Sequence, residues 1–406
     1  MVEDHDISEN DHRVIGKKLD LFHIDGENRG MVFWHPNGHS IWRSVEQYVR
    51  RRLELSDYKE VRSPQLMNKH FWQASGHWDK YKPNMYVCDS DEGDESLALK
   101  PMNCPAHVQI FNSSQRSYRD LPMRMSEFGC CHRKEPSGSL LGLFRVASFV
   151  QDDAHIFCRE DQVVGEIAEF IRLARSVHAD FGFKVKEVRL ATRPENRSGS
   201  DEFWDKAEAD LAQAAKDAGI VAVIAEGDGA FYAPKLDFVV EDSMGREWVC
   251  GTVQLDYVLP KRLGAFYIGE DDQKHHPVMV HRAILGSFER FIGILLENYA
   301  GSLPVWLSPV QVVVANISSY SEEYSRYVVD QFKNAGVRVE VDLRSERIDA
   351  KVRDAAMKKV PYIVVLGKKE LEQRSVSIRG RDGKSQVMKL DDAVKYLVDE
   401  SKSPVY

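Results

Sequence analysis

The chain has 406 residues, of which 43% are hydrophobic and 29% charged, and its formal net charge at pH 7 is −8. These values are ordinary for a globular protein long enough for two domains, and the acidic balance argues against a general nucleic-acid coat. No apolar run approaches the roughly 18 residues that cross a membrane. The six cysteines are scattered without C-x-x-C pairs, so we expect a reducing compartment and no disulfide framework.

The predicted elements of the first part begin after a polar, acidic stretch. Residues 1–10 are expected to form a flexible lead-in rather than a secretory or mitochondrial signal, which points to the cytoplasm. Helices are predicted over 40–58, 159–182 and 198–219, the last with a Ser or Asp N-cap. Strand-like runs are predicted at 58–66, 86–90, 97–101, 144–153, 155–158, 235–242 and 248–258.

This order of elements predicts an α+β fold with a mainly antiparallel sheet. The sequence contains neither G-x-x-x-x-G-K-[ST] nor a strand-borne G-x-G-x-x-G, so a P-loop or dinucleotide-binding fold is not indicated. A nucleotide must therefore be held in another way.

A second domain is predicted to begin after two prolines, Pro304 and Pro309. Strands over 310–316, 337–343 and 361–367 alternate with helices over 321–336 and 345–359, and a final strand–helix pair follows. This pattern predicts a small α/β domain. We expect a first domain over 11–305 and a second over 306–406. The stretch 309–406 has 18 Lys and Arg against 15 Asp and Glu, a mildly basic balance compatible with local RNA contact.

Three separated strings each carry one candidate metal ligand. They are KPMNCPAH with Cys104, QDDAH with His155 and MVHRAILGS with His281. One Cys and two His that leave a fourth position open are typical of a catalytic rather than a structural zinc. Each residue alone would more often be a buried Cys or a hydrogen-bonded core His. Arg133 and Arg290 stand in neighbouring strings and suggest a phosphate beside the metal.

Taken together, the ordered strings resemble bacterial-type threonyl-tRNA synthetases, a family of class II aminoacyl-tRNA synthetases. The resemblance runs from about His12 to the C-terminus and rests on SGHWDKY, KPMNCPAH, EFGCCHRKEPSG, QDDAHIFC, GAFYAPKLDF, CGTVQLDY and VHRAILGSFERF. It implies a class II catalytic domain, an anticodon-binding domain and no counterpart of the family's N-terminal domains, which include the serine-editing site. It also implies one Zn²⁺ per chain and Mg²⁺ with ATP.

The resemblance assigns roles to individual residues. It implies zinc ligation by Cys104, His155 and His281, and catalytic roles for Arg133, Arg290 and His77. Threonine would contact Gln151, Asp153, Tyr232 and Gln254. ATP would contact Arg133, Glu135, Arg145, Gln254, Ser287 and Arg290. Anticodon bases would contact Ser345, Arg353, Glu370 and Arg379.

The resemblance also implies partners and a reaction. The expected activity is ATP-dependent formation of threonyl-adenylate and transfer of the threonyl group to tRNA(Thr). A homodimer is expected, formed through the first helix and strand around Val61 to Pro64. Serine differs from threonine by one methyl group, so misacylation with serine is expected in a chain that lacks an editing domain.

The chain departs from the family pattern close to these residues. Where the family has glycine, Ala106 and Ala233 add a methyl group. Ser345 replaces an asparagine used in anticodon reading, and Val150 replaces a threonine. Leu141 replaces a histidine of the family, and Ala147 replaces an arginine that reaches toward the ATP phosphates. The loss of one charge-assisted contact weakens binding of ATP or of the transition state by about 1.5–3 kcal/mol.

These departures motivate two alternative hypotheses. One is a divergent paralogue that activates threonine or a related β-hydroxy or β-amino acid for a non-tRNA acceptor, or that confers resistance to an inhibitor. The other is an RNA-binding or regulatory protein with a structural zinc. The presence of Arg133, Arg290, Asp153 and His77 together disfavours the second hypothesis, because such a protein needs no chemistry residues.

Overall fold

The computed structural model describes residues 8–88, 96–230 and 232–405. It divides into two compact units. The larger unit consists of Ile24–Val32 and Arg51–Ile294, and the smaller of Met1–His23, Phe33–Arg50 and Leu295–Tyr406. Of the predicted lead-in over 1–10, residues 1–7 lie outside the described residues, and residues 8–10 are exposed. Within the described ranges, no helix is long and apolar enough to cross a membrane.

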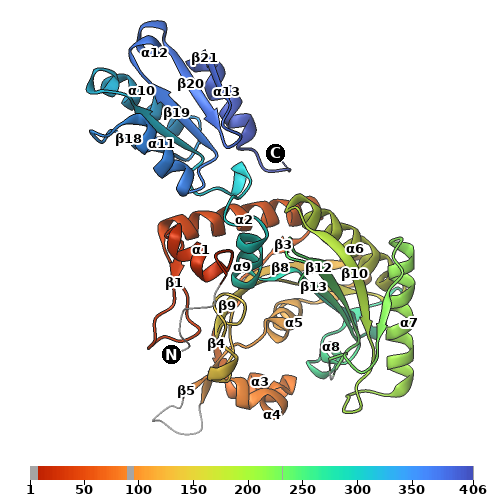
Figure 1. Ribbon diagram of the computed structural model, residues 1–406. Coiled ribbons are helices and arrows are strands. Elements are labelled where there is room, and N and C mark those ends of the chain that lie inside the picture. Colours follow the sequence, from red (N-terminus) through yellow and green to blue (C-terminus); the bar gives the residue numbers. More distant parts are fainter. Residues whose placement is uncertain (1–7, 89–95, 231, 406) are drawn as a thin grey trace. The chain divides into compact units, whose positions relative to one another are not determined.

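The larger unit is built on an eight-stranded sheet (Figure 1) with the strand order β11-β10-β12-β13-β16-β9-β8-β3. All neighbours in it are antiparallel except β10 with β11 and β3 with β8. Its strands are β3 (Lys59–Glu60), β8 (Met123–His132), β9 (Ser148–Cys158), β10 (Lys184–Ala191), β11 (Val223–Ala225), β12 (Lys235–Glu241), β13 (Glu247–Asp256) and β16 (Val278–Ser287). The mainly antiparallel α+β fold is therefore confirmed.

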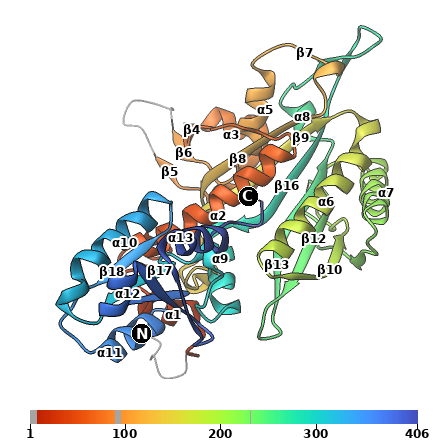
Figure 2. The ribbon, with the colours of Figure 1, turned by 90° about the horizontal axis from the view of Figure 1, so that it is seen from above.

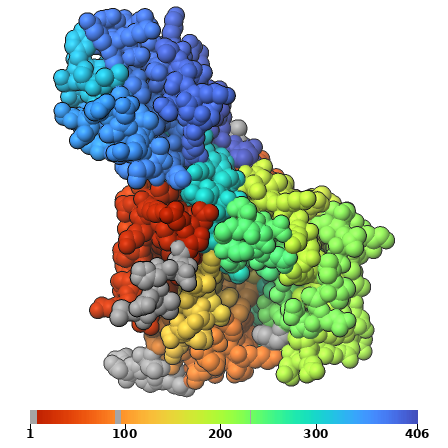
Figure 3. Space-filling model, viewed as in Figure 1, coloured from red at the N-terminus to blue at the C-terminus, as the bar shows by residue number. Residues whose placement is uncertain are grey.

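Helices and small sheets complete this unit. Helix α6 contacts β10 and β16, and α7 contacts α6 and β10; both helices present an apolar stripe to their neighbours, as their 3.6-residue periodicity predicts. Figure 3 shows the molecule in space-filling form from the same side as Figure 1, with residues 163–217 in yellow-green and green. The helices are α3 (Lys69–Ser75), α4 (His77–Tyr81), α5 (Cys104–Asn112), α6 (Val163–Asp180), α7 (Asp201–Asp217) and α8 (Leu259–Arg262). The short strands are β4 (Leu66–Asn68), β5 (Val87–Cys88), β6 (Leu97–Leu99), β7 (Arg116–Ser117), β14 (Tyr267–Ile268) and β15 (Lys274–His275). The predicted strand over 86–90 is thus β5, and its last two residues lie outside the described residues.

The smaller unit contains a five-stranded sheet with the order β18-β17-β19-β20-β21 (Figure 2). Its first three strands are parallel and its last two antiparallel. Val312 and Val314 pack in the cluster that includes α10 and α13, whereas Val313 packs with Ala355 of α11, so helices cover both faces of the sheet. The strands are β17 (Val312–Asn316), β18 (Val339–Asp342), β19 (Tyr362–Leu366), β20 (Ser375–Gly380) and β21 (Ser385–Lys389); the helices are α10 (Glu322–Asn334), α11 (Ile348–Met357), α12 (Lys368–Gln373) and α13 (Leu390–Glu400).

The end of the chain differs from the prediction of one strand and one helix. A helix, α12, and a hairpin of two strands precede α13. The hairpin turn contains Asp382 and Gly383, and Gly383 has a φ of +78°. Glycine adopts this left-handed backbone without a steric penalty, and Asp-Gly between alternating residues is the sequence signal for such a turn. The remaining elements are α1 (His12–Lys18), β1 (Phe22–His23), β2 (Phe33–Trp34), α2 (Pro36–Leu55) and α9 (Phe288–Asn298).

A buried ion pair fixes the irregular end of β16. The pairing of β16 with β9 shifts register between Ala283 and Ser287. The carboxylate of Asp152 accepts hydrogen bonds from the backbone N–H groups of Ile284, Leu285 and Gly286, at 2.7–3.0 Å. The guanidinium of Arg282, only 1% exposed, lies 4.0 Å from the same carboxylate. Asp152 therefore satisfies three N–H groups that the bulge removes from the β-ladder.

We expect Asp152→Ala to lower the free energy of unfolding by about 3–5 kcal/mol, because it leaves the charge of Arg282 buried without its partner. Urea unfolding followed by tryptophan fluorescence measures the loss. Asp161→Ala is the matched control, since Asp161 forms a largely exposed pair with Arg159 and its removal should change stability little. Equal midpoints for the two variants would contradict this account of the bulge.

Candidate active site and metal centre

Strand register brings the predicted metal ligands together. Gln254 of β13 lies opposite His281 of β16, which lies opposite His155 of β9. Cross-strand neighbours project from the same face of a sheet, so these three side chains form a row. Cys104, the first residue of α5, meets this row: the ligand atoms of Cys104, His155 and His281 all lie within 4.8 Å of one another. All three residues are buried.

The hydrogen bonds of His281 identify which of its ring nitrogens carries no proton. Its Nε2 lies 3.1 Å from Oδ2 of Asp256. A carboxylate only accepts, so Nε2 carries the proton and Nδ1 presents a lone pair. That Nδ1 lies 3.0 Å from Nε2 of His155. Two imidazole nitrogens this close must share either a proton or a cation.

The donor set fits zinc. Burial raises the pKa of the Cys104 thiol and lowers that of the His155 imidazole, so both groups are uncharged in the absence of a cation. One thiolate and two imidazole nitrogens, with a carboxylate behind one of the histidines, match the first and second coordination shells of catalytic zinc sites.

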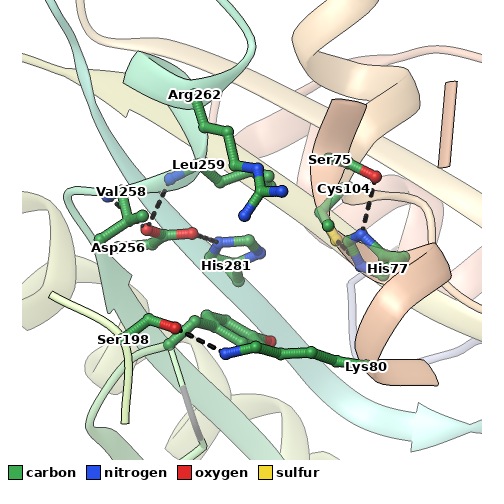
Figure 4. Close-up of a pocket in the computed structure, with 12 residues that line it drawn as sticks. Ser75, His77, Lys80, Cys104, Ser198, Asp256, Val258, Leu259, Arg262 and His281 are labelled. Atoms are coloured by element: carbon green, nitrogen blue, oxygen red, sulfur yellow. Dashed lines mark hydrogen bonds and ion pairs between the residues drawn. The ribbon is translucent and has the colours of Figure 1, made fainter. Parts of the chain in front are cut away.

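A pocket opens beside two of these ligands, Cys104 and His281. Its wall includes Cys104, His281, Asp256, Tyr232 and His77. Figure 4 shows His77 and Cys104 from one side of the pocket facing His281 and Asp256 on the other.

Two predicted threonine contacts are held by hydrogen bonds in this pocket region. The hydroxyl of Tyr232 donates to Oε1 of Gln254 at 2.7 Å. Burial raises the pKa of Tyr232, which keeps this hydroxyl protonated. Gln151, further along β9, lies opposite Ser287 of β16, so the predicted amino-acid and nucleotide residues continue along neighbouring strands.

Asp153 is oriented by a residue that the sequence analysis did not single out. Asn103, fully buried, donates from Nδ2 to Oδ2 of Asp153 at 2.9 Å. Gly129 of β8 makes room for it, because a Cβ at 129 would lie 2.3 Å from Asn103 Nδ2. Asn103 stands directly before Cys104 in the sequence, and that adjacency is the signal that could have identified it.

Three of the predicted ATP contacts, Arg133, Arg145 and Glu135, already have partners within the protein. The guanidinium of Arg133 donates to the carbonyl of Pro101 at 3.2 Å and lies 5.0 Å from the ring centroid of Phe149. Arg145 forms two hydrogen bonds to Oε2 of Glu135, at 3.0 and 2.8 Å, so these two predicted nucleotide contacts pair with each other. A nucleotide that uses either group must share or replace this pair.

Arg290 has unused hydrogen-bonding capacity. Its backbone N–H donates to Oγ of Ser287 at 3.1 Å, and its guanidinium lies 5.7 Å from the ring centroid of Trp248. Among the described residues, its buried Nε has no hydrogen-bond acceptor. A buried N–H without an acceptor is costly, and an oxyanion from a ligand would remove that cost.

His77 is neutral and oriented. Burial lowers its pKa to about 4. The hydroxyl of Ser75 donates to the carbonyl of Trp72 at 3.1 Å, so its oxygen accepts from Nδ1–H of His77 at 2.9 Å. Nε2 of His77 is therefore the bare nitrogen, and it lies 3.9 Å from the sulfur of Cys104.

The four predicted anticodon contacts lie in the smaller unit. Ser345 follows β18, Arg353 is in α11, Glu370 is in α12 and Arg379 is in β20. Glu370 accepts a hydrogen bond from the N–H of Gly367 at 2.9 Å, whereas Ser345, Arg353 and Arg379 are exposed. No hydrogen bond or ion pair in the described ranges joins any two of the four.

The positions that depart from the family pattern differ in burial. Ala106, Ala147 and Ala233 are 3% exposed or less, whereas Leu141 is 47% exposed. The N–H of Ala147 donates to the carbonyl of Gly30 at 2.8 Å. A Cβ on Gly30 would lie 3.1 Å from that of Ala147, so the segment around Gly30 covers this alanine.

Two family models match the chain. The model of the tRNA synthetase class II core domain (G, H, P, S and T) matches residues 86–299, and the model of an anticodon binding domain matches residues 311–400. Among curated proteins, a threonine–tRNA ligase of Phenylobacterium zucineum (strain HLK1) is 60% identical over 396 residues, which cover 97% of this chain and 60% of the relative. A threonine–tRNA ligase of Maricaulis maris (strain MCS10) is 55% identical, covering 97% of this chain and 62% of the relative. The chain thus spans about three fifths of these relatives.

Solved structures agree with these matches. The RNA binding domain of threonyl-tRNA synthetase from Cryptosporidium parvum Iowa II is 35% identical with a TM-score of 0.94, covering 98% of this chain and all of that chain. A prolyl-tRNA synthetase of Giardia lamblia is 17% identical with a TM-score of 0.72, covering 96% of this chain and 78% of that one, which shows a shared fold.

We expect Gly129→Ala to destabilise the larger unit by about 1–3 kcal/mol, because the added methyl group overlaps the amide of Asn103. Thermal unfolding measures the shift. The matched control is Gly165→Ala in α6, where a Cβ meets nothing within 4 Å and alanine should stabilise the helix by up to about 1 kcal/mol. A stable Gly129→Ala variant would show that Asn103 moves freely.

Proposed function

Because the chain belongs to the threonyl-tRNA synthetase family of class II aminoacyl-tRNA synthetases, we propose that it is a zinc-dependent threonine–tRNA ligase. The proposed reaction joins the carboxylate of L-threonine to the α-phosphate of ATP with release of pyrophosphate. The threonyl group of the adenylate then passes to a terminal ribose hydroxyl of tRNA(Thr), and AMP leaves. The observation that carries the proposal is the meeting of Cys104, His155 and His281 beside a pocket lined by polar groups.

The amino-acid end of the site supports recognition of a hydroxyl. Zinc, when bound to Cys104, His155 and His281, would supply a Lewis-acidic coordination position for the amine and side-chain hydroxyl of threonine. Asp153 accepts from Asn103 through Oδ2, and its Oδ1 lies 3.9 Å from Nε2 of His155, so the carboxylate stands near the proposed metal position, where the threonine hydroxyl would bind. Valine lacks this hydroxyl and would leave buried polar groups without partners, so it should be rejected strongly.

The nucleotide end supports stabilisation of phosphate charge. Attack by a carboxylate on the α-phosphorus adds negative charge, which the guanidinium of Arg133 would offset near the α-phosphate. Arg290, whose Nε has no acceptor in the described part of the chain, would contact the other end of the nucleotide with Ser287 and Gln254. Glu135 would bind the adenine amino group, and Arg145 would stay near the phosphates. Mg²⁺ would accompany ATP.

The transfer step would use His77. Its Nε2 is bare because Nδ1–H donates to Ser75, so the ring presents an acceptor beside the pocket. This geometry supports a role in accepting the proton of the terminal tRNA ribose. The low pKa keeps the ring neutral at physiological pH, although it makes His77 a weak base.

The two parts of the chain would share recognition of tRNA. We assign catalysis to residues 11–305 and anticodon binding to 306–406, where Ser345, Arg353, Glu370 and Arg379 would contact the anticodon bases. The exposed side chains of Arg353 and Arg379 support contact with unstacked bases. We further propose a homodimer formed around Val61 to Pro64 and a cytoplasmic location.

A second candidate function rests on the departures from the family pattern. Ala147 is buried beneath the segment around Gly30, so no side chain extends from this position toward a nucleotide. The chain would then be a paralogue that activates threonine or a related β-hydroxy or β-amino acid for a non-tRNA acceptor, or that withstands an inhibitor. Adenylate formation without tRNA charging would distinguish it.

We expect threonine-dependent exchange of pyrophosphate into ATP, and threonylation of tRNA(Thr), by the purified 406-residue chain. Serine should support exchange about 10–200-fold less well than threonine, since a pocket discriminates one methyl group by that factor. We propose that these 406 residues carry no editing site, so seryl-tRNA should accumulate.

The outcomes of this assay separate the hypotheses. Exchange without charging of any tRNA supports the second candidate function. Absence of exchange with threonine, serine and β-hydroxy analogues contradicts both. Absence of seryl-tRNA, despite exchange with serine, contradicts the proposed lack of editing alone.

We expect one zinc ion per chain by elemental analysis of the purified protein, and less than one tenth of that in the Cys104→Ala variant. The matched control is Cys250→Ala, because Cys250 is equally buried but lies outside the ligand cluster. Its zinc content should equal that of the unmodified chain. A metal-free chain that does not take up zinc on dialysis would refute the metal centre.

A further inference from the structure

A line of buried polar side chains leads from the metal ligands into the core of the larger unit. Nδ1 of His155 lies 2.8 Å from Nδ1 of His107, one turn into α5. Nε2 of His107 lies 3.0 Å from Oε2 of Glu127 on β8. His107 has no exposed surface and Glu127 is 4% exposed. Neither residue belongs to the set that the family resemblance assigns.

Glu127 at the far end of this line is a carboxylate. Its Oε1 accepts from Nζ of Lys100 at 2.9 Å and from the N–H of Ser63 at 2.9 Å, and the Ser63 hydroxyl lies 2.8 Å from Oε2. Burial opposes ionisation, but hydrogen bonds from His107, Ser63 and Lys100 outweigh it and lower the pKa of Glu127 to about 2. Glu127 therefore only accepts hydrogen bonds.

The proton positions along the line follow from this one acceptor. Nε2 of His107 must carry the proton that Glu127 accepts, so the imidazole presents the lone pair of its Nδ1 to His155. Nδ1 of His155 must then donate to it, which leaves Nε2 of His155 without a proton.

We infer that Glu127 and His107 are positioning residues for the metal centre, because together they fix the tautomer of His155 whose Nε2 faces Cys104 and His281. The inference rests on the zinc dependence proposed above and deepens it. His281 has direct support from a carboxylate, Asp256, whereas His155 has the same support relayed through a second imidazole. The opposite tautomer of His155 would place a proton where the metal must bind.

A tautomer that is fixed before the metal arrives lowers the free-energy cost of binding. Outer-shell partners of this kind change metal affinity by about 10–100-fold. Their effect should therefore be visible in the metal affinity of the purified protein, without any measurement of catalysis. Glutamine at 127 can both donate and accept, so it would allow either tautomer of His107.

The test is the zinc dissociation constant of the full chain, measured at one pH by competition with a chromophoric chelator. We expect Glu127→Gln to weaken zinc binding about 10–100-fold. The matched control is Glu166→Gln: Glu166 is also buried and pairs with Arg124, but it touches neither the ligands nor the relay. Its zinc affinity should stay within about threefold of the unmodified chain, even where its stability falls.

A second variant guards against misfolding of Glu127→Gln, which leaves Lys100 without its carboxylate. His107→Phe removes the acceptor for His155 and keeps an aromatic ring, and it should weaken zinc binding to a similar degree. In the double variant the loss should not exceed that of His107→Phe alone, because both residues act through one line of hydrogen bonds. Additive losses would indicate two separate structural effects and would overturn the relay.

Different measurements would overturn this inference and the proposed zinc site. Zinc affinities of Glu127→Gln and His107→Phe within about threefold of the unmodified chain would overturn the positioning role and leave the metal centre in place. An unmodified chain that binds no zinc would overturn the metal centre itself.

Discussion

The register of four antiparallel strands determines where each polar group of the site stands. Because Gln254, His281 and His155 are cross-strand neighbours, their side chains emerge in one row on one face of the sheet. The next pair along β9 and β8, Asp153 with Glu127, lies on the same face. The strand-borne members of the site and of the relay depend on this alignment, since a shift by one residue would turn them to the other face, away from Cys104 and His107 on α5.

Local sequence patterns predicted most of the elements but not their partners. Helices α6 and α7 and strands β12 and β13 appear close to their predicted ranges, because amphipathic or alternating periodicity is a local property. The hairpin of β20 and β21 was missed although Asp382 and Gly383 mark its turn. Strand β9 begins only at Ser148, because the N–H of Ala147 bonds to Gly30 instead of continuing the ladder.

The site was predictable to the extent that short strings carried it. Cys104, His155 and His281 were identified from three strings, and the structure gathers them. Asp256, His107 and Glu127 were not identified, because their roles depend on contacts between residues far apart in the sequence, such as His107 and Glu127 at a sequence separation of 20. A buried Glu or His has no distinctive local signature, and only the fold shows what it touches.

The bulge at Asp152 and the alternation along β9 limit how such a site can change. Even-numbered residues of β9, such as Asp152, bond to the backbone of the bulge. Odd-numbered residues, such as Asp153 and His155, project toward the candidate metal site. Loss or gain of a single codon within this strand would exchange the two sets at once and abolish both. Divergence of specificity must therefore proceed by replacement at fixed length, and chains with a new substrate should align with this one without gaps across the strand.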